Sequence, residues 1–143
     1  MSRLYITHGS EKKDDSLRGT NQRVTPDRLY TATTIRRFTR KCIDKSVEWA
    51  ILSDKFGVVF PQEKIDWYQK HPDQVDEEEF QWLLGNFIYR LFGYDWVWFY
   101  HNPRSFHPLY GRLVEEARDR GLQVKMFSHL SEIRITEDTQ EEK

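Results

Sequence analysis

Four short apolar runs alternate with segments of helical spacing along the chain, and this alternation restricts the fold more than any other feature. The runs are bounded by Gly or polar clusters, as are strands buried on both faces of a parallel sheet. Between them, apolar side chains recur every three or four residues, as along one side of an amphipathic helix. Strands are therefore predicted over residues 4–7, 47–52, 94–100 and 122–127, and helices around residues 35–42, 80–91 and 106–117.

The order of these segments predicts the fold class. Strands that alternate with helices are joined by right-handed crossovers, which place the strands parallel in one sheet and the helices against it. We therefore expect an α/β three-layer sandwich, with a mostly parallel central sheet of about four strands and helices on both faces. Residues 9–28 and 56–76 are expected to form long irregular connections that follow strands.

The predicted helices have matching start and stop signals. Asp76, followed three residues later by Glu79, resembles a capping box at the start of the second helix. Gly93 and Gly121 stand where the C-terminal caps of the second and third helices are expected, and Pro108 suits a first turn. These signals support the helix boundaries drawn from the apolar spacing.

Length and composition indicate one domain of a globular protein. The 143 residues predict a single α/β domain over residues 1–135 and a disordered charged tail over residues 136–143. The 22 basic and 23 acidic side chains nearly cancel, so bulk charge does not indicate a polyanionic partner. Cys42 is the only cysteine, which excludes an intramolecular disulfide. We find no membrane span or secretion signal in the sequence and expect a cytoplasmic location.

The stretch AILSDKFGVVFP, residues 50–61, interrupts an apolar run with Ser53, Asp54 and Lys55. These three residues follow the second predicted strand directly. Ligands of open parallel sheets bind at the carboxyl ends of the strands. His8 follows the first strand and His101 follows the third, so we expect the polar residues of all these strand ends to lie at one edge of the sheet.

The strand ends supply the candidate site residues. Asp54 and His101 are candidate catalytic residues, because a carboxylate or an imidazole at a strand end can transfer protons. The loop after the first strand could hold an anion, although it lacks the glycine pattern of a dinucleotide fingerprint. Ordinary turns are the alternative interpretation at each strand end. The candidate ligand-binding residues here are His8, Gly9, Ser10, Lys13, Ser53, Lys55 and Asn102.

Three further features allow a binding or a structural interpretation. Trp67 and Tyr68 are expected to be exposed aromatic residues that either stack on a base or anchor their loop to the core. Gly57 is expected to adopt a positive φ. A basic stretch on the first helix could contact the phosphates of a nucleic acid, with a solvated helix face as the alternative. Its residues are Arg36, Arg37, Arg40 and Lys41.

The five histidines show no close ligand spacing, so no metal site is predicted, and the sequence indicates no particular cofactor. Cys42 lies on an apolar helical face and is expected in the core.

The segments THGSEKKD, RLYT and WAILSDKFGVVFPQEKIDWY together resemble a widespread domain family of unknown function. That family reads Ser-Cys-Gly-x-x-Lys, then Leu-Tyr-Thr, then Ile-Leu-Ser-Ala-Lys-x-Gly. The chain is also similar to the N-terminal region of archaeosine synthases and, more distantly, to peroxide-stress and uracil-DNA-glycosylase-like proteins. The resemblance covers about the first half of the chain. It adds Tyr30, Gly57 and Tyr68 to the candidate ligand-binding residues.

The chain departs from the family pattern at three places. His8 stands where the family often has Cys, Asp54 where it often has Ala, and Trp67 where Pro is common. The resemblance implies a role in nucleobase, nucleotide or nucleic-acid metabolism. Two classes of function stay open: a small enzyme that acts on a nucleoside, nucleotide or modified base, and a non-catalytic module that binds a nucleotide, a nucleic acid or a protein.

Overall fold

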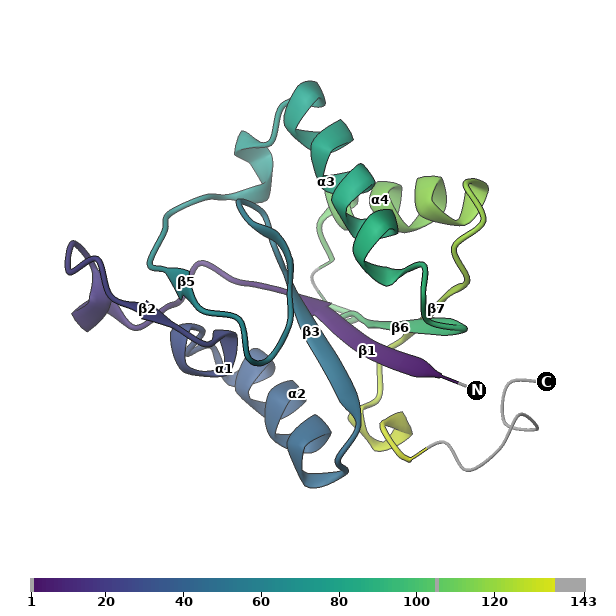
Figure 1. Cartoon of the computed structure of the whole chain (residues 1–143), viewed down its shortest axis with the longest axis horizontal. Helices are drawn as coiled ribbons and strands as arrows, with labels where there is room; N and C mark the ends of the chain where they lie inside the picture. Colours follow the sequence, from purple (N-terminus) through teal and green to yellow (C-terminus); the bar gives the residue numbers. More distant parts are fainter. Residues whose placement is uncertain (1, 105, 136–143) are drawn as a thin grey trace.

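A five-stranded sheet forms the centre of the computed structural model, which describes residues 2–104 and 106–135 (Figure 1). The strands lie in the order β4-β3-β1-β6-β7. β1 pairs in parallel with β3 on one side and β6 on the other, β6 pairs in parallel with β7, and β4 runs antiparallel to β3. The strands are β1 (Arg3–His8), β3 (Glu48–Ser53), β4 (Gly57–Val59), β6 (Trp96–Tyr100) and β7 (Val124–Phe127).

Helices cover both faces of this sheet. α2 packs against one face, and α3 and α4 lie side by side on the other (Figure 1). The predicted α/β fold with a mostly parallel sheet between helical layers is therefore confirmed, with five strands where about four were expected. The helices are α1 (Pro26–Leu29), α2 (Thr33–Asp44), α3 (Glu77–Leu91) and α4 (Pro108–Asp119), with 3-10 helices η1 (Asp15–Leu17), η2 (Pro72–Gln74) and η3 (Leu130–Glu132).

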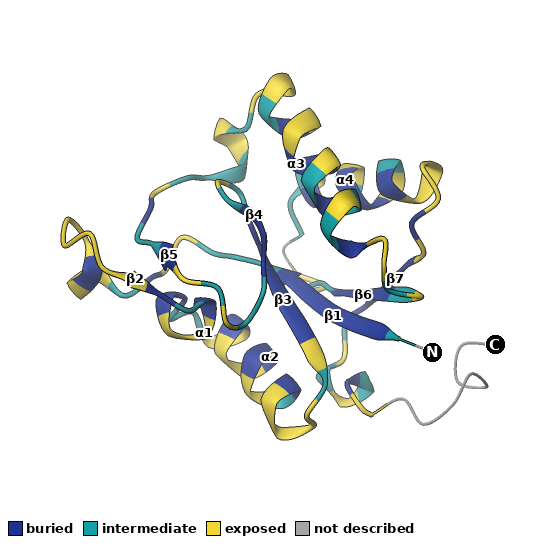
Figure 2. Cartoon of the chain, viewed as in Figure 1, coloured by how far each residue is buried: buried dark blue, intermediate teal, exposed yellow. Residues whose placement is uncertain are grey.

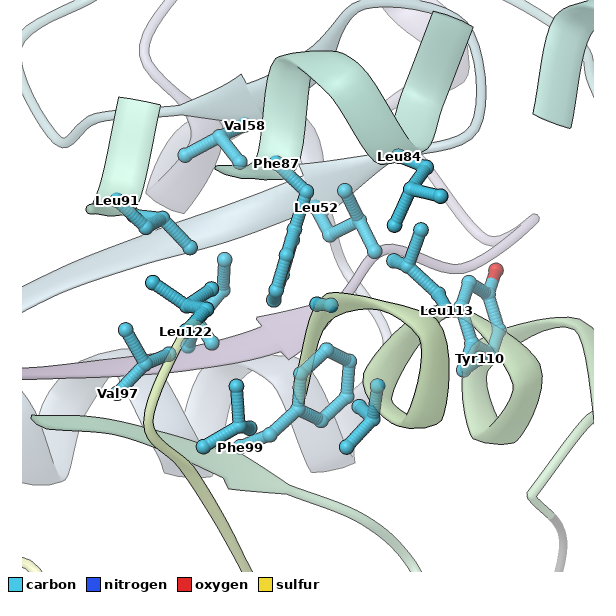
Figure 3. Packing of buried hydrophobic residues seen from close by; sticks show 14 of the residues in the cluster. Leu52, Val58, Leu84, Phe87, Leu91, Val97, Phe99, Tyr110, Leu113 and Leu122 are labelled. Carbon is cyan, nitrogen blue, oxygen red and sulfur yellow. The ribbon is translucent and has the colours of Figure 1, made fainter. Parts of the chain in front are cut away.

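The sheet separates two hydrophobic cores, because successive side chains of a strand point to opposite faces. On β1, Leu4 and Ile6 pack in the core beneath α3 and α4, whereas Tyr5 packs in the core beneath α2. Figure 3 shows the first core, where Phe87 of α3 and Phe99 of β6 fill the space between the layers. In Figure 2 the strands are buried and the outer faces of the helices are exposed. The continuous apolar runs of the sequence are thus explained by burial on both faces.

Both stretches that were expected to be irregular contain short strands. β4 follows β3 after a turn and extends the sheet by an antiparallel edge strand. Further along, β2 (Arg23–Val24) and β5 (Ile65–Asp66) pair with each other in a separate ribbon. Two or three residues are too few to show a periodicity, so the sequence pattern could not reveal these strands.

Most of the predicted helix signals are confirmed. The carboxylate of Asp76 accepts a hydrogen bond from the Glu79 amide at 2.8 Å, and the Glu79 side chain accepts one from the Asp76 amide, so the capping box is present. Pro108 occupies the first turn of α4, and Gly121 follows that helix with a φ of +100°. α3 ends at Leu91 with Phe92 as its C-terminal cap, so Gly93 directly follows the cap, and it has no positive φ.

Cys42 is fully buried in the core beneath α2, as predicted. Within the described ranges, no helix combines the length and the apolar character needed to span a membrane. The predicted charged tail, residues 136–143, lies outside the described residues.

Gly57 lies where the β3–β4 hairpin packs against α3. Gly57 has a φ of +78°, as predicted, and an added Cβ would lie 2.2 Å from Oδ1 of Asn86. That oxygen accepts a hydrogen bond from the Val58 amide at 2.8 Å. Arg90 of α3 donates to the Val58 carbonyl at 2.8 Å. The absence of a Cβ at this position lets α3 approach the hairpin closely.

We predict that Gly57→Ala lowers the free energy of unfolding by about 2–3 kcal/mol. A left-handed backbone costs a residue with a Cβ ~1–2 kcal/mol, and losing the hydrogen bond to Asn86 costs ~1 kcal/mol more. Gly19→Ala is the matched control, because Gly19 has a φ of +76° and an added Cβ there would have nothing within 4 Å. Urea denaturation measures both, and equal losses in the two variants would contradict this account.

Candidate functional site

The parallel register brings the predicted strand ends to one edge of the sheet. His8 is the residue of β1 opposite Leu52 of β3, and Thr7 is opposite Tyr100 of β6. The residues that follow these positions therefore leave the sheet side by side. This places His8, Ser53 and His101 at the same edge.

A pocket of about 440 Å³ opens at this edge. Its walls come from the loop after β1, from the turn after β3, from the segment that contains η2 and from the start of α4. A volume of this size lies in the range of small-molecule sites. The lining residues are His8, Gly9, Ser10, Glu11, Asp54, Tyr68, Lys70, His71, Pro72, Phe106, His107 and Tyr110.

Tyr110 holds the two polar groups of this pocket that the strand ends supply. Its hydroxyl donates a hydrogen bond to Oδ1 of Asp54 at 2.6 Å. Its ring stacks on the ring of His8, with centroids 4.4 Å apart and planes at 6°. Tyr110 is buried in the first turns of α4 and packs in the core beneath that helix, with its hydroxyl oxygen visible in Figure 3. The core thus fixes the ring that positions Asp54 and His8.

Asp54 carries a carboxyl group with a raised pKa. Burial raises the pKa of Asp54 above its ordinary value, and the hydrogen bond from Tyr110 and the charge of Lys13 offset part of that rise. Because Tyr110 donates to Oδ1, the second carboxyl oxygen has no part in that bond. A carboxyl group that keeps its proton to higher pH is suited to general acid or base chemistry.

The pKa of His8 is shifted in the opposite direction. Burial lowers the pKa of His8, so the neutral ring is favoured. Nδ1 lies 2.7 Å from the Gly9 carbonyl oxygen, which can only accept, so Nδ1 carries the proton. In the neutral ring Nε2 then holds a lone pair and can accept a proton. Burial therefore shifts the two pKa values in opposite directions, upward for the Asp54 carboxyl group and downward for the His8 ring.

Ser53 lies beneath the pocket and not in it. It is fully buried, and its Oγ accepts hydrogen bonds from the amides of Lys55 and Phe56 at 3.1 and 2.9 Å. The hydroxyls of Tyr30 and Tyr68 hydrogen-bond with each other, and the nearby Ser53 hydroxyl offsets part of the rise that burial causes in the pKa of each. Burial raises the pKa of Tyr68 to about 12, so this hydroxyl stays neutral. These residues form a buried floor that fixes the turn carrying Asp54.

Tyr68 was expected to be exposed, and this expectation was wrong. It is 5% exposed, because its loop folds back onto the core beneath α2. The neighbouring Trp67 is half-buried and packs against the same core. The anchoring interpretation of this aromatic pair therefore holds, although Tyr68 still lines the pocket.

Lys13 and Gly9 complete the floor. The Lys13 ammonium lies 4.3 Å from the centre of the Tyr68 ring, and burial lowers the pKa of Lys13 while the charge of Asp54 raises it. Gly9 has no Cβ, and one added there would lie 2.7 Å from the ring of Tyr30. Tyr30 therefore requires glycine at position 9, which gives both residues of the resembled pattern a structural role.

A chain of acidic and histidine side chains forms the rim. Nδ1 of His107 accepts a hydrogen bond from the Leu109 amide at 3.0 Å, so its Nε2 donates to Oδ1 of Asp73 at 2.6 Å. The other side of the rim joins His71 to Asp73 at 3.2 Å and to Glu11 at 3.5 Å. These contacts connect η2, the start of α4 and the loop after β1 across the mouth of the pocket.

The remaining predicted site residues lie around the pocket. Lys55 is exposed, with its ammonium 5.3 Å from the centre of the Phe56 ring, and Gly57 serves the hairpin. Asn102 lines a smaller hollow of about 170 Å³ that shares His8 and Ser10 with the main pocket. The ring of His101 lies 5.3 Å from that of Phe106. Of the two candidate catalytic residues, only Asp54 lines the main pocket.

The sequence pattern missed Tyr110, Phe106 and the rim residues. Tyr110 and Phe106 fall on the apolar spacing of the third predicted helix, where they were counted as core. The one available signal was that α4 begins directly after a strand end, so its first turn faces the same edge. The segment around η2 is distant in sequence from every strand end that it approaches.

Arg36, Arg37 and Arg40 are exposed on α2, and Lys41 is half-buried, opposite the buried Ile35, Phe38 and Cys42. Among the residues that the structure describes, no three His, Cys, Asp or Glu side chains are grouped so as to hold a metal ion.

No family model, curated protein or solved structure matches the chain. The resemblance to the domain family and to the archaeosine synthases therefore stays a prediction. The pocket combines aromatic walls with a raised pKa at Asp54 and a lowered pKa at His8.

We predict that Asp54 makes the chain less stable as pH rises. The folded chain binds the Asp54 proton more tightly than the unfolded chain does, so the free energy of unfolding falls between the ordinary pKa of about 4 and the raised value. Asp54→Asn removes this loss. Its melting temperature, relative to that of the original chain, should therefore increase from about pH 4 upward and level off above the raised pKa.

The exposed Asp44, at the end of α2, provides the control for this measurement. The variant Asp44→Asn should show a difference in melting temperature that does not follow this pH course. If the Asp54→Asn difference is equally flat, the pKa of Asp54 is not raised.

Proposed function

We propose that the chain is a small enzyme that binds a nucleobase or nucleoside in this pocket and transfers protons to or from it. One observation carries the proposal: Tyr110 positions a half-buried carboxyl group and a neutral imidazole in the same aromatic pocket. Opposed pKa shifts of two neighbouring groups are typical of acid–base sites. The resemblance to proteins of nucleobase metabolism favours the same class of substrate.

The walls suit a planar heterocycle. Phe106, Tyr68 and Tyr110 supply aromatic surface, and each nucleobase has a π-face that stacks on such rings. The carboxyl group of Asp54 can accept a hydrogen bond from a ring N–H or an exocyclic amine, or donate one when protonated. Lys70 at the rim adds a positive charge that suits an anionic substituent.

The two polar groups have distinct roles in this proposal. The raised pKa of Asp54 lets it give a proton to the substrate, or take one from an attacking water, at higher pH than an ordinary carboxyl group would. His8 accepts a proton at Nε2, since Nδ1 is held by the Gly9 carbonyl. Tyr110 is a positioning residue, because it holds Asp54 by a hydrogen bond and His8 by stacking. The floor formed by Ser53, Tyr30 and Tyr68 limits the movement of Asp54.

Asp54→Asn tests the catalytic role, because it keeps the shape and the hydrogen-bond acceptor while removing the acid. Turnover of any substrate found in a panel of nucleosides, nucleotides and modified bases should fall at least ~100-fold, with the affinity little changed. Asp44→Asn should leave turnover unchanged. Initial rates and isothermal titration calorimetry measure the two quantities.

Unchanged turnover in Asp54→Asn would contradict the catalytic role of Asp54. Binding of a panel member without turnover by the original chain would favour the non-catalytic binding module over the enzyme. In that case Asp54 would serve recognition, and Asp54→Asn would weaken binding instead.

A second candidate function is the binding of nucleic acid by α2. Arg36 and Arg40 of α2 line a surface hollow of about 560 Å³ together with Arg28 of α1 and the carboxylate of Asp27. Three guanidinium groups around one hollow suit phosphate oxygens. We propose this surface as a phosphate-contacting face, either for a strand whose base enters the pocket or for a separate polyanion.

Salt dependence tests this second candidate. Each of Arg36→Ala and Arg40→Ala should weaken oligonucleotide binding and reduce the slope of log affinity against log salt by about 1, because one phosphate contact is lost. Lys64→Ala, which removes an exposed charge from the loop before β5, should leave the slope unchanged. Affinity that does not depend on salt would exclude this role.

A further inference from the structure

α3 exposes a stripe of aromatic side chains that the pocket does not use. Trp82, Tyr89 and Phe92 are 52%, 77% and 70% exposed. Among the described residues, they are three of the five large hydrophobic side chains that are exposed. Figure 2 shows this outer face of α3 turned to solvent. Isolated exposed apolar residues are ordinary, whereas a continuous patch marks an interaction surface.

The same face lacks charge. The ten residues from Phe80 to Tyr89 contain no Asp, Glu, Lys or Arg, in a chain whose residues are 31% charged. A solvated helix face is normally polar and charged. Beyond the charged first turn with Glu77 and Glu78, the exposed positions of α3 instead combine aromatic rings with Gln81 and Gly85.

The spacing of the stripe suits pairing with another helix. Trp82, Gly85, Tyr89 and Phe92 follow one another at three, four and three residues, the alternation of a coiled-coil seam. We propose that this face binds the same face of a second copy of the chain, with the two α3 helices antiparallel about a two-fold axis near residue 87. Trp82 then meets Phe92 of the other copy, and Gly85 meets Tyr89 of the other copy.

Size complementarity supports this register. A Cβ added at Gly85 would have nothing within 4 Å, so the surface there is an open notch between Trp82 and Tyr89. In the antiparallel pair the most exposed ring, Tyr89, enters the notch of the other copy, and the same contact recurs across the axis. A two-fold interface requires such self-complementarity.

Area and charge agree with the proposal. At their exposed fractions, the three rings present about 400 Å² in each copy, so that the pair with its flanking residues approaches the ~1,200 Å² of a small stable interface. The acidic Glu78 at the start of one α3 lies beyond Phe92 of the other copy. Arg120, directly after α4, and Asp95 line the hollow beside Phe92. The Asp95 carboxylate already accepts hydrogen bonds from Ser2, so Arg120 is the charge that Glu78 can pair with at each end.

This dimer is independent of the proposed function. The lining residues of the main pocket belong to other segments than α3, so pairing through α3 leaves the pocket open. Loss of the dimer and loss of turnover are therefore separate outcomes.

Sedimentation equilibrium of the full chain over a concentration series tests the proposal. The original chain should approach twice its 17.4 kDa mass. Tyr89→Glu and Gly85→Glu should each weaken self-association at least ~10-fold, because each places charge in the buried seam. Ile43→Glu is the matched control, since Ile43 is 53% exposed but lies on α2, and it should leave the mass unchanged. Glu favours helix over Gly, so Gly85→Glu should fold, as circular dichroism would verify.

Charge reversal tests the register. Glu78→Arg should weaken self-association about threefold, and adding Arg120→Glu should restore it, because the two side chains face each other twice in the pair. A chain that stays monomeric over the whole concentration range would overturn the proposal. Equal effects of Tyr89→Glu and Ile43→Glu would overturn it as well, and failure of the second charge reversal to restore association would overturn the antiparallel register.

Discussion

The parallel pairing of β1 with both β3 and β6 is the constraint on which the rest of the structure depends. A parallel neighbour cannot be reached by a tight turn, so the chain must cross a face of the sheet to reach it. β1 is followed by α2 on one face, and β3 is followed by α3 on the other, because the next strands lie on opposite sides of β1. After β1 the chain forms β3 on one side of it, and it then crosses the sheet to form β6 on the other side. The loops at the carboxyl ends separate at this point, and the pocket opens there.

Tyr110 links the core beneath α4 to the two titratable groups of the pocket. As part of the core beneath α4 it cannot move freely, and it holds Asp54 by a hydrogen bond and His8 by stacking. Removing a carboxyl group from water costs free energy, and a hydrogen bond to a charged group returns only ~1.5–3 kcal/mol of it. The remaining penalty appears as the raised pKa of Asp54. This penalty at a pocket, beside a histidine with a lowered pKa, is the arrangement on which the proposed acid–base function rests.

Periodicity predicted the layers of this fold but not the contents of its site. The four parallel strands and the helices could be read from the sequence because each is long enough to show its repeat. β4, with three residues, could not. His8, Gly9, Ser10 and Asp54 were found because parallel strands end together. Tyr110 was missed because its ring follows the apolar spacing of the core, although the same ring also lines the pocket.

Other differences between prediction and structure come from tertiary contacts. Tyr68 belongs to a polar loop and was expected to be exposed, yet the loop folds back and buries it against Tyr30. Ser53 was expected to contact a ligand, but its hydroxyl fixes the backbone of its own turn. Of the resembled residues, Gly9 and Tyr68 each lie against Tyr30, so packing accounts for their placement.

A pH titration followed by NMR, of the Asp54 carboxyl carbon and the His8 ring nitrogens, tests the acid–base pair most directly. The account predicts a midpoint for Asp54 above the ordinary ~4 and one for His8 below the ordinary ~6.5, with the neutral ring protonated at Nδ1. It also predicts that both midpoints return toward their ordinary values in Tyr110→Ala, which opens the pocket to water. Ordinary midpoints for both groups in the original chain would contradict the account.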